Sequence, residues 1–143
     1  MRARLNDLVC LAMALAAVTA SQANAHGAIA IGGNTSEVAA KGIAVGDGYN
    51  YEAQADADAR ALQECEARRA GTAVGPCAIV TSFSHQWLFV SMDPAPGTPG
   101  FGWSIDADRE TAQSNALKQC QASSPDNRKQ YCVVTQSDQD ERP

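Results

Sequence analysis

The sequence predicts an α+β fold built from two pseudo-repeats, each with the order strand, strand, helix, strand. The first observation is the cysteine spacing: Cys65 and Cys77 stand twelve positions apart, and so do Cys120 and Cys132. The second is that an Ala-Leu dipeptide precedes the first cysteine of each pair by the same distance. The two copies are separated by about 55 residues, a length that is typical of repeated supersecondary units.

Each repeat is predicted to begin with two short strands. An apolar run opens the repeat, and a glycine-flanked run then returns as its hairpin partner. The opening strands are residues 27–32 and 86–92, and the returning strands are residues 42–49 and 100–104. The glycine-ended segment 32–42 is expected to be a connecting loop.

One helix and one final strand complete each repeat. Alanine, leucine and cysteine recur at helical spacing over residues 51–68 and 106–122, which predicts two helices with alanine-rich buried faces. Asn50 and Asp106 are the expected N-caps. The segments 77–83 and 131–135 contain β-branched residues and are predicted to be the last strand of each repeat.

The cysteine positions predict two disulfides, Cys65–Cys77 and Cys120–Cys132. In each pair the first cysteine ends a helix and the second starts a strand, so the bond would fasten the helix to the sheet. Such a bond stabilises a small domain by roughly 2–3 kcal/mol in chain-entropy estimates. The alternative is a four-cysteine zinc site, but zinc ligands usually come in close Cys-x-x-Cys pairs, and the sequence has none.

Residues 1–25 have the pattern of a secretory signal peptide. A basic start is followed by a short apolar run and by the small-x-small sequence Ala-Asn-Ala before His26. Cleavage after Ala25 fits best, with Ala20 and Ala23 as other choices; an uncleaved anchor is the alternative, although the run is short for a membrane span. We therefore expect an exported protein, periplasmic or extracellular, without a membrane association after cleavage.

The remaining chain is expected to form one domain, residues 26–137, divided into repeats 26–83 and 84–137, with a polar tail at 138–143. The whole chain has a formal net charge of −5. The predicted leader contributes about +1, so the mature charge is about −6. An acidic surface disfavours nucleic acid and anionic lipid as partners and favours a basic protein.

The arrangement resembles an exported bacterial family called domain of unknown function 4189. The resemblance is carried by Gly-Ala-Ile-Ala at 27–30, by Ala-Leu-x-x-Cys at 61–65 and by Cys-x-x-Val at 77–80, and it covers most of residues 26–137. It implies an exported domain without an established catalytic activity, and it transfers no active site. Members often carry two further cysteines, which this chain lacks, consistent with the loss of one disulfide.

A recognition surface is the first candidate site. The Pro- and Gly-rich loop 93–100 is expected to be exposed and fairly stiff. Aromatic residues flank it, and residues of this type often anchor protein interfaces. The predicted binding residues are Trp87, Pro96, Phe101 and Trp103; the alternative is that the aromatic residues fill the core of the second repeat.

A copper site is the second candidate. If cleavage leaves His26 at the N-terminus, its amine and imidazole could chelate Cu(II), with the imidazole of His85 as a third nitrogen ligand. The two histidines begin equivalent strands of the two repeats, which places them at a common end. Frayed or exposed strand ends would explain the same two residues without a metal.

A hydrolase is the least favoured of three functional classes. Ser82, Ser84, His85 and Asp93 include the residue types of a nucleophilic triad, but neighbours in sequence do not by themselves form one, and a Gly-x-Ser-x-Gly elbow is missing. We expect no catalytic residue and no cofactor. The predicted function is a non-enzymatic protein-binding domain: an inhibitor or immunity protein against an antibacterial enzyme, or a secreted effector.

Overall fold

The structure, a computed structural model, describes residues 25–139. The signal peptide predicted for residues 1–25 therefore lies outside the described residues, except for Ala25. The first repeat contains the strands β1 (His26–Gly32), β2 (Ala44–Tyr51) and β3 (Cys77–Phe83), the helices α1 (Val38–Lys41) and α2 (Gln54–Arg69), and the 3-10 helix η1 (Thr35–Glu37). The second repeat contains β4 (Trp87–Met92), β5 (Phe101–Asp106), α3 (Arg109–Ser123), η2 (Lys129–Tyr131) and β6 (Val133–Gln139).

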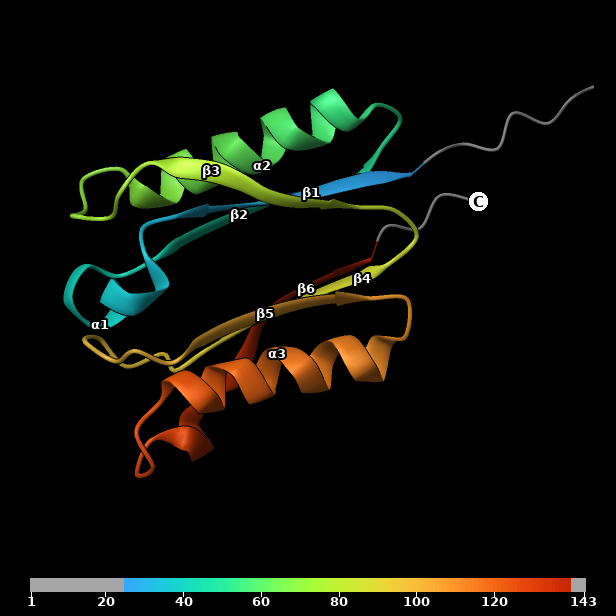
Figure 1. Cartoon of the computed structure of the whole chain (residues 1–143). Coiled ribbons are helices and arrows are strands. Elements are labelled where there is room, and N and C mark those ends of the chain that lie inside the picture. The colour runs from blue at the N-terminus through green and yellow to red at the C-terminus, as the bar shows by residue number, and fades with distance from the viewer. Residues whose placement is uncertain (1–24, 140–143) are drawn as a thin grey trace, which may run out of the picture.

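Each repeat forms its own antiparallel sheet, with the first strand in the middle. The strand orders are β2-β1-β3 and β5-β4-β6. The two sheets face each other, α2 covers the outer face of the first sheet, and α3 covers the outer face of the second (Figure 1). The molecule is thus a four-layer α/β/β/α sandwich, and the predicted α+β class with two repeats is confirmed.

Three layers of buried side chains hold the sandwich together. The inter-sheet layer contains the large aliphatic and aromatic side chains, namely Ile29, Ile31, Val45, Phe83, Leu88, Val90 and Phe101. In the two helix–sheet layers the helices contribute mainly alanine and cysteine, such as Ala57, Ala61 and Cys65 in α2 and Ala112, Ala116 and Cys120 in α3. In the second of these layers the sheet contributes Phe89, with Trp87 partly buried beside it. Because many of the large apolar side chains lie between the sheets, contact between the two repeats contributes much of the hydrophobic stabilisation of the fold.

Glycine lets each helix lie unusually close to its sheet. A Cβ at Gly46 would fall 2.1 Å from the carbonyl oxygen of Ala61, and a Cβ at Gly102 would fall 2.5 Å from that of Ala116. Real Cβ atoms do not approach backbone atoms this closely. The small alanine faces of α2 and α3 are therefore matched by glycine on the strands beneath them.

Both predicted disulfides are present. Cys65, in the last turns of α2, is bonded to Cys77, the first residue of β3, with Cα atoms 6.1 Å apart. Cys120 of α3 is bonded to Cys132, directly before β6, with Cα atoms 5.9 Å apart. Each bond joins the C-terminal part of a helix to the start of the next strand.

Several boundaries differ from the prediction. The strands predicted at 42–49, 100–104 and 131–135 are Ala44–Tyr51, Phe101–Asp106 and Val133–Gln139, the last because residues 129–131 form the 3-10 helix η2. The helices start later, at caps Ala53 and Asp108 instead of Asn50 and Asp106, because β2 and β5 stay paired with the central strands as far as Tyr51 and Asp106. The segment 32–42 contains η1 and α1 and is not a plain loop. Asp138 and Gln139, assigned to the polar tail, belong to β6 and pair with β4; residues 140–143 lie outside the described residues.

Among residues 25–139, no helix has the length and apolar character needed to cross a membrane.

Candidate functional site

The loop between β4 and β5, residues 93–100, is closed by hydrogen bonds within itself. The backbone N–H of Asp93 donates to the carbonyl of Gly100 at 3.1 Å, and an Asp93 carboxylate oxygen accepts from the N–H of Ala95 at 3.0 Å. The hydroxyl of Thr98 donates to the carbonyl of Ala95 at 2.7 Å. The loop therefore has a defined shape, as its proline content also favours.

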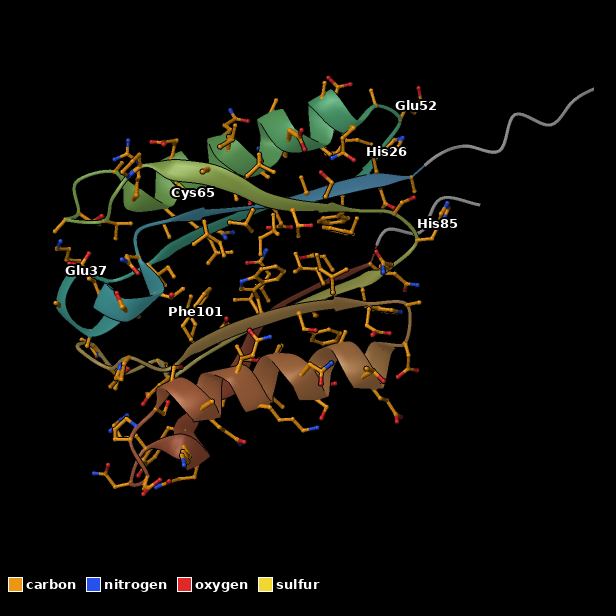
Figure 2. All side chains as sticks on the ribbon, viewed as in Figure 1. His26, Glu37, Glu52, Cys65, His85 and Phe101 are labelled. Carbon is orange, nitrogen blue, oxygen red and sulfur yellow. A yellow bond between two sulfur atoms is a disulfide. The ribbon has the colours of Figure 1, made fainter. Side chains whose placement is uncertain are left out.

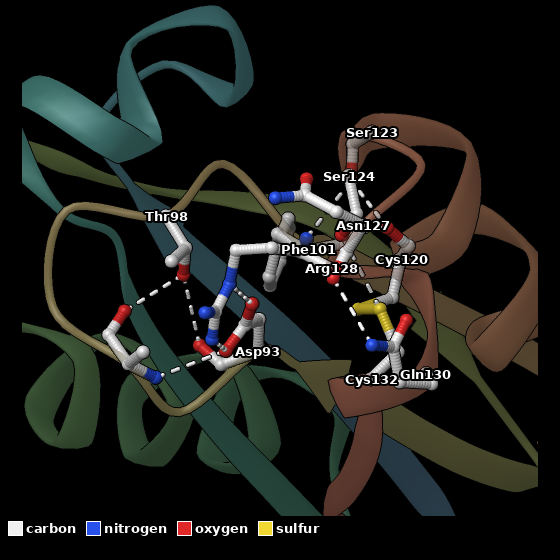
Figure 3. A network of polar contacts seen from close by, with 11 residues as sticks. Asp93, Thr98, Phe101, Cys120, Ser123, Ser124, Asn127, Arg128, Gln130 and Cys132 are labelled. Carbon is white, nitrogen blue, oxygen red and sulfur yellow. Dashed lines mark hydrogen bonds and ion pairs between the residues drawn. A yellow bond between two sulfur atoms is a disulfide. The ribbon is translucent and has the colours of Figure 1, made fainter.

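An ion pair attaches this loop to the following segment of the chain. The Arg128 guanidinium donates to both carboxylate oxygens of Asp93, at 2.5 and 2.8 Å, as Figure 3 shows. Asp93 is only 7% exposed, and its hydrogen bonds with Arg128 hold the pKa of its carboxyl below the ordinary value. Such a bidentate pair fixes both distance and orientation.

The end of the loop is attached to the C-terminus of α3. The Ser123 hydroxyl accepts from the N–H of Phe101 at 2.9 Å and contacts the carbonyl of Cys120 at 2.9 Å. The neighbouring Ser124 hydroxyl donates to the same Cys120 carbonyl at 2.8 Å and lies 3.5 Å from the sulfur of Cys132 (Figure 3). Loop, helix end and disulfide thus form one connected network.

Exposed apolar side chains lie next to this network. Tyr131 is 49% exposed, and its ring lies 4.6 Å from the Arg128 guanidinium carbon. Val133 is 46% exposed and pairs with Met92, the residue before the loop. We call this surface the loop face; it consists of Pro94, Pro96, Gly97, Tyr131 and Val133, all of them exposed.

The predicted binding residues do not form one surface. Phe101 is buried between the sheets, where Figure 2 shows it, and Trp103 packs on the same inter-sheet core. Trp87 lies on the other face of its sheet, against the layer under α3, with the Arg109 guanidinium 5.3 Å from its ring. Of the four predicted residues, only Pro96 belongs to the loop face.

The two histidines do lie at the same end of the molecule, as Figure 2 shows. His26 begins β1, and His85 lies in the turn between the repeats with a positive φ of 52°. The hydroxyl of Ser84 donates to the carbonyl of Ala25 at 2.6 Å, and Ala25 is fully buried. Within the described residues, no three His, Cys, Asp or Glu side chains come together as a metal site.

The residues considered for a nucleophilic triad are separated. Ser84 and His85 precede β4, whereas Asp93 follows it, so the length of the strand lies between base and acid. Both carboxylate oxygens of Asp93 also bind Arg128. The structure therefore does not assemble Ser82, Ser84, His85 and Asp93 into a triad.

A second polar arrangement, which sequence reasoning missed, lies where β2 of the first sheet meets β6 of the second. The side-chain amide of Gln136 donates to a carboxylate oxygen of Asp47 and, at 3.3 Å, to one of Asp138. Arg68 of α2 donates to the Gln136 oxygen at 3.2 Å and to Glu64 at 3.2 Å. We call Asp47, Gln136 and Asp138 the inter-sheet seam.

The inter-sheet seam places acidic groups in a poorly hydrated position. Asp47 is 6% exposed. Burial raises the pKa of its carboxyl to about 7, and the nearby charges of Asp138 and Glu64 act in the same direction. The charge of Asp138, followed by burial, also raises the pKa of Tyr49 above its ordinary value.

The seam has no equivalent in the other half of the sandwich. Asp47 follows Gly46, and Trp103 follows Gly102; the two glycines are equivalent because each contacts the matching helix backbone. The second repeat thus has a tryptophan where the first has a buried carboxylate. The sequence signal for a polar residue at this position is the alternation Gly46-Asp47-Gly48. On a strand, this alternation directs both glycines to the helix and the aspartate to the opposite face.

Comparison with known proteins gives one match. A family model described as "Domain of unknown function (DUF4189)" matches residues 26–138. Neither the curated proteins nor the solved structures contain a match.

Proposed function

The chain belongs to the DUF4189 family, and from the surface of this chain we propose that it is an exported, non-enzymatic domain that binds another protein through the loop face. Export is supported by the two disulfides, since such bonds persist in oxidising compartments. The leader-like pattern of residues 1–25 supports it as well.

The observation that carries the proposal is the rigid attachment of an exposed apolar surface. A bidentate ion pair between the buried Asp93 and the partly exposed Arg128 holds loop 93–100 beside Tyr131 and Val133, which are each almost half exposed. A surface that is ordered before binding loses little conformational entropy in the complex. Exposed tyrosine beside a fixed loop is also a common anchor in protein interfaces.

The partner we propose is a basic protein. The chain carries a formal net charge of −5, which attracts a cationic partner at long range and increases the association rate. One candidate is an enzyme that attacks the bacterial cell wall, with this domain as its inhibitor or immunity protein. The other candidate, equally compatible with the sequence, is a host protein bound by a secreted effector.

The test compares three forms of the oxidised protein, residues 25–143, as bait for periplasmic and secreted extracts. The wild type is compared with the double variant Tyr131→Ala/Val133→Ser, which removes the apolar part of the loop face. The matched control is Val80→Ser, because Val80 is 45% exposed but lies on β3 of the other repeat. We expect one saturable partner that binds the wild type and the control and binds the double variant at least about tenfold more weakly, as expected when an interface anchor is lost.

Equal capture by the double variant would contradict the choice of surface. If the extracts contain no saturable partner for any form, protein binding itself is contradicted for those extracts.

A copper site on His26 and His85 is our second proposal, because both residues lie at one end of the molecule (Figure 2). It requires a chain that starts at His26, so that the free amine becomes available. Cu(II) titration of this form, followed by electron paramagnetic resonance, should give a nitrogen-rich signal that changes in His85→Ala. A form that starts at Ala25 is the control and should not give this signal; identical spectra for all three forms would exclude the site.

A further inference from the structure

The inter-sheet seam connects the two repeats through a single amide group. Gln136 of β6 donates to Asp47 of β2 and to Asp138 of its own strand. Both carboxyl groups therefore lie within reach of one nitrogen atom. Asp47 belongs to the first sheet, whereas Asp138 belongs to the second, so the arrangement bridges the sandwich at its β2–β6 side.

Two carboxylates in such a position repel each other strongly when both are ionised, because water has little access to Asp47 to screen its charge. Asp47 is 6% exposed and is the more buried of the two. When one proton is present, a neutral carboxyl can donate to the other carboxylate, and the contact becomes attractive. The contact between the sheets thus depends on the protonation of the pair.

We propose that the inter-sheet seam is a pH-sensitive contact between the two repeats, closed while Asp47 and Asp138 share one proton and loosened once that proton is lost. The seam and the loop face share strand β6, with Val133 of the loop face three positions before Gln136. The pH-sensitive contact would make the β2–β6 side of an exported protein responsive to the pH around it.

The charged groups around the pair act in both directions. Glu64, from α2, adds negative charge and favours retention of the proton, whereas Arg68, from the same helix, favours its loss. On β2 itself, Tyr49 is close enough for Asp47 and Asp138 to raise its pKa. Tyr51 of β2 and Arg60 of α2 line the same pocket as Asp47. The neighbouring strand β1 contributes the apolar Ile29, which pairs with Asp47. The acidic groups and burial outweigh Arg68, since the pKa of Asp47 is raised to about 7.

A pocket beside the seam indicates what loosening would expose. It has a volume of ≈ 310 Å³, and its lining includes Val45, Val90 and Met92 together with Arg68 and Gln136. The apolar members belong to or pack against the inter-sheet core. Separation of β2 from β6 would widen this pocket and hydrate part of that core.

The sign of the pH effect follows from the proton balance. In the unfolded chain Asp47 loses its proton near pH 4. In the folded chain Asp47 keeps this proton to about pH 7. The folded state binds the additional proton between these values, so the free energy of unfolding falls as pH rises through this range.

The first experiment compares urea unfolding of the wild type and of Asp47→Asn between pH 5 and pH 9. The asparagine side chain resembles the neutral carboxyl and carries no proton to lose. We expect the unfolding equilibrium constant of the wild type to rise, relative to Asp47→Asn, by at least about tenfold over this range. Asp56→Asn is the matched control, because Asp56 is exposed in the first turn of α2. Its unfolding equilibrium constant should change with pH in the same way as that of the wild type.

The second experiment, carbon NMR of the side-chain carboxyls in the folded wild type, does not depend on a folded variant. The Asp47 signal should titrate near pH 7, and Asp138→Asn should move this midpoint to lower pH. A midpoint near pH 4 in the wild type would overturn the proposal. Parallel unfolding curves for the wild type and Asp47→Asn would overturn it as well.

Discussion

The ion pair between Asp93 and Arg128 gives the second repeat a feature that the first repeat lacks. Ile31 and Met92 occupy equivalent positions on the central strands. Ile31 pairs with Val45, the residue before Gly46, and Met92 pairs with Phe101, the residue before Gly102. Both glycines lie against a helix backbone. The residue after Ile31 is Gly32, whereas the residue after Met92 is Asp93. The aspartate at this position thus gives the second connector an ion-pair partner that glycine cannot provide in the first.

We predict that Arg128→Gln leaves Asp93 without its cationic partner and loosens the loop. The melting temperature should fall, and amide hydrogen exchange of residues 94–99 should become faster. Because the ion pair lowers the pKa of Asp93, its stabilisation is present above about pH 4 and disappears as the pH falls further. The difference in melting temperature from the wild type should therefore shrink in acid.

Arg69→Gln is the control for Arg128→Gln. Its ion pair with Glu66 joins two partly exposed side chains of the same helix. The melting temperature and the exchange of the loop amides should therefore change little. Unchanged loop exchange in Arg128→Gln would show that the prolines and the hydrogen bonds within the loop order it without the ion pair.

Ser84 provides a second prediction at this scale. Its hydroxyl donates to the carbonyl of the buried Ala25, a contact that cleavage after Ala25 would remove. Ser84→Ala should lower the free energy of unfolding by about 1 kcal/mol. In a chain that starts at His26 the same substitution should have no effect. Urea unfolding of four proteins, the wild type and Ser84→Ala in chains that start at Ala25 or at His26, measures this difference. An equal loss in both backgrounds would show that the hydrogen bond contributes nothing.

At the scale of the elements, the close approach of helix to strand rests on Gly46 and Gly102. Gly46→Ala and Gly102→Ala should each lower the free energy of unfolding by at least 1–3 kcal/mol, an order-of-magnitude estimate for an overfilled site. In both variants the new methyl group meets helix backbone, which cannot move aside alone. Gly75→Ala is the control, since a Cβ at Gly75 would lie 3.6 Å from its nearest atom, the Cα of Gly33. Thermal or urea unfolding of the three variants measures the loss of stability in each.

The disulfides act on the same helix–strand units. Replacement of Cys65 and Cys77 by serine should lower the free energy of unfolding by about 3 kcal/mol, and replacement of Cys120 and Cys132 by a similar amount, because both close loops of equal length. Urea unfolding of the two double variants measures this. A much smaller loss in one of them would show that its helix is held mainly by packing.

Local signals in the sequence were sufficient to predict the six strands and the two long helices, but not the residues at which they begin and end. The strand predicted at 77–83 matches β3, and the cysteine spacing predicted both disulfides. The helix caps were placed too early because pairing within each sheet extends β2 to Tyr51 and β5 to Asp106. The four-residue helix α1 was missed because it is too short to show a periodic pattern.

At the scale of the whole molecule, the two repeats are incomplete without each other. Ile29, Phe83, Leu88 and Val90 lose their access to solvent only because the sheets face one another. Neither local patterns nor the repeat itself indicates which faces meet. For this reason the burial of Asp47, and with it the inter-sheet seam, could not be predicted from the sequence.

The aromatic residues show the same limit at the candidate site. Phe101 and Trp103 flank loop 93–100 in sequence, and we predicted them as binding residues, with burial of the aromatic residues in the core of the second repeat as the alternative. Their side chains instead contribute to the inter-sheet core, while the exposed Tyr131 comes from a segment that lies beside the loop only in three dimensions. The loop was identified from its composition, but the loop face required the fold.

The register of the two sheets also determines where the chain could be reconnected. β1 starts beside Phe83, because Gly27 pairs with it, and β6 ends beside Trp87, which pairs with Gln139. The first and last strands therefore flank the short connector at 84–86. A circular permutant opened between His85 and Gln86, with a glycine-serine linker from residue 139 to residue 25, should fold with both disulfides intact.

Circular dichroism and disulfide mapping by mass spectrometry would measure this, and an unfolded or mispaired permutant would contradict it. Since a change in loop closure costs only about 1 kcal/mol, we expect nearly unchanged stability. Either half of the gene could then be translated first, and the order in which the ribosome delivers the two repeats would not be part of the information that specifies the fold.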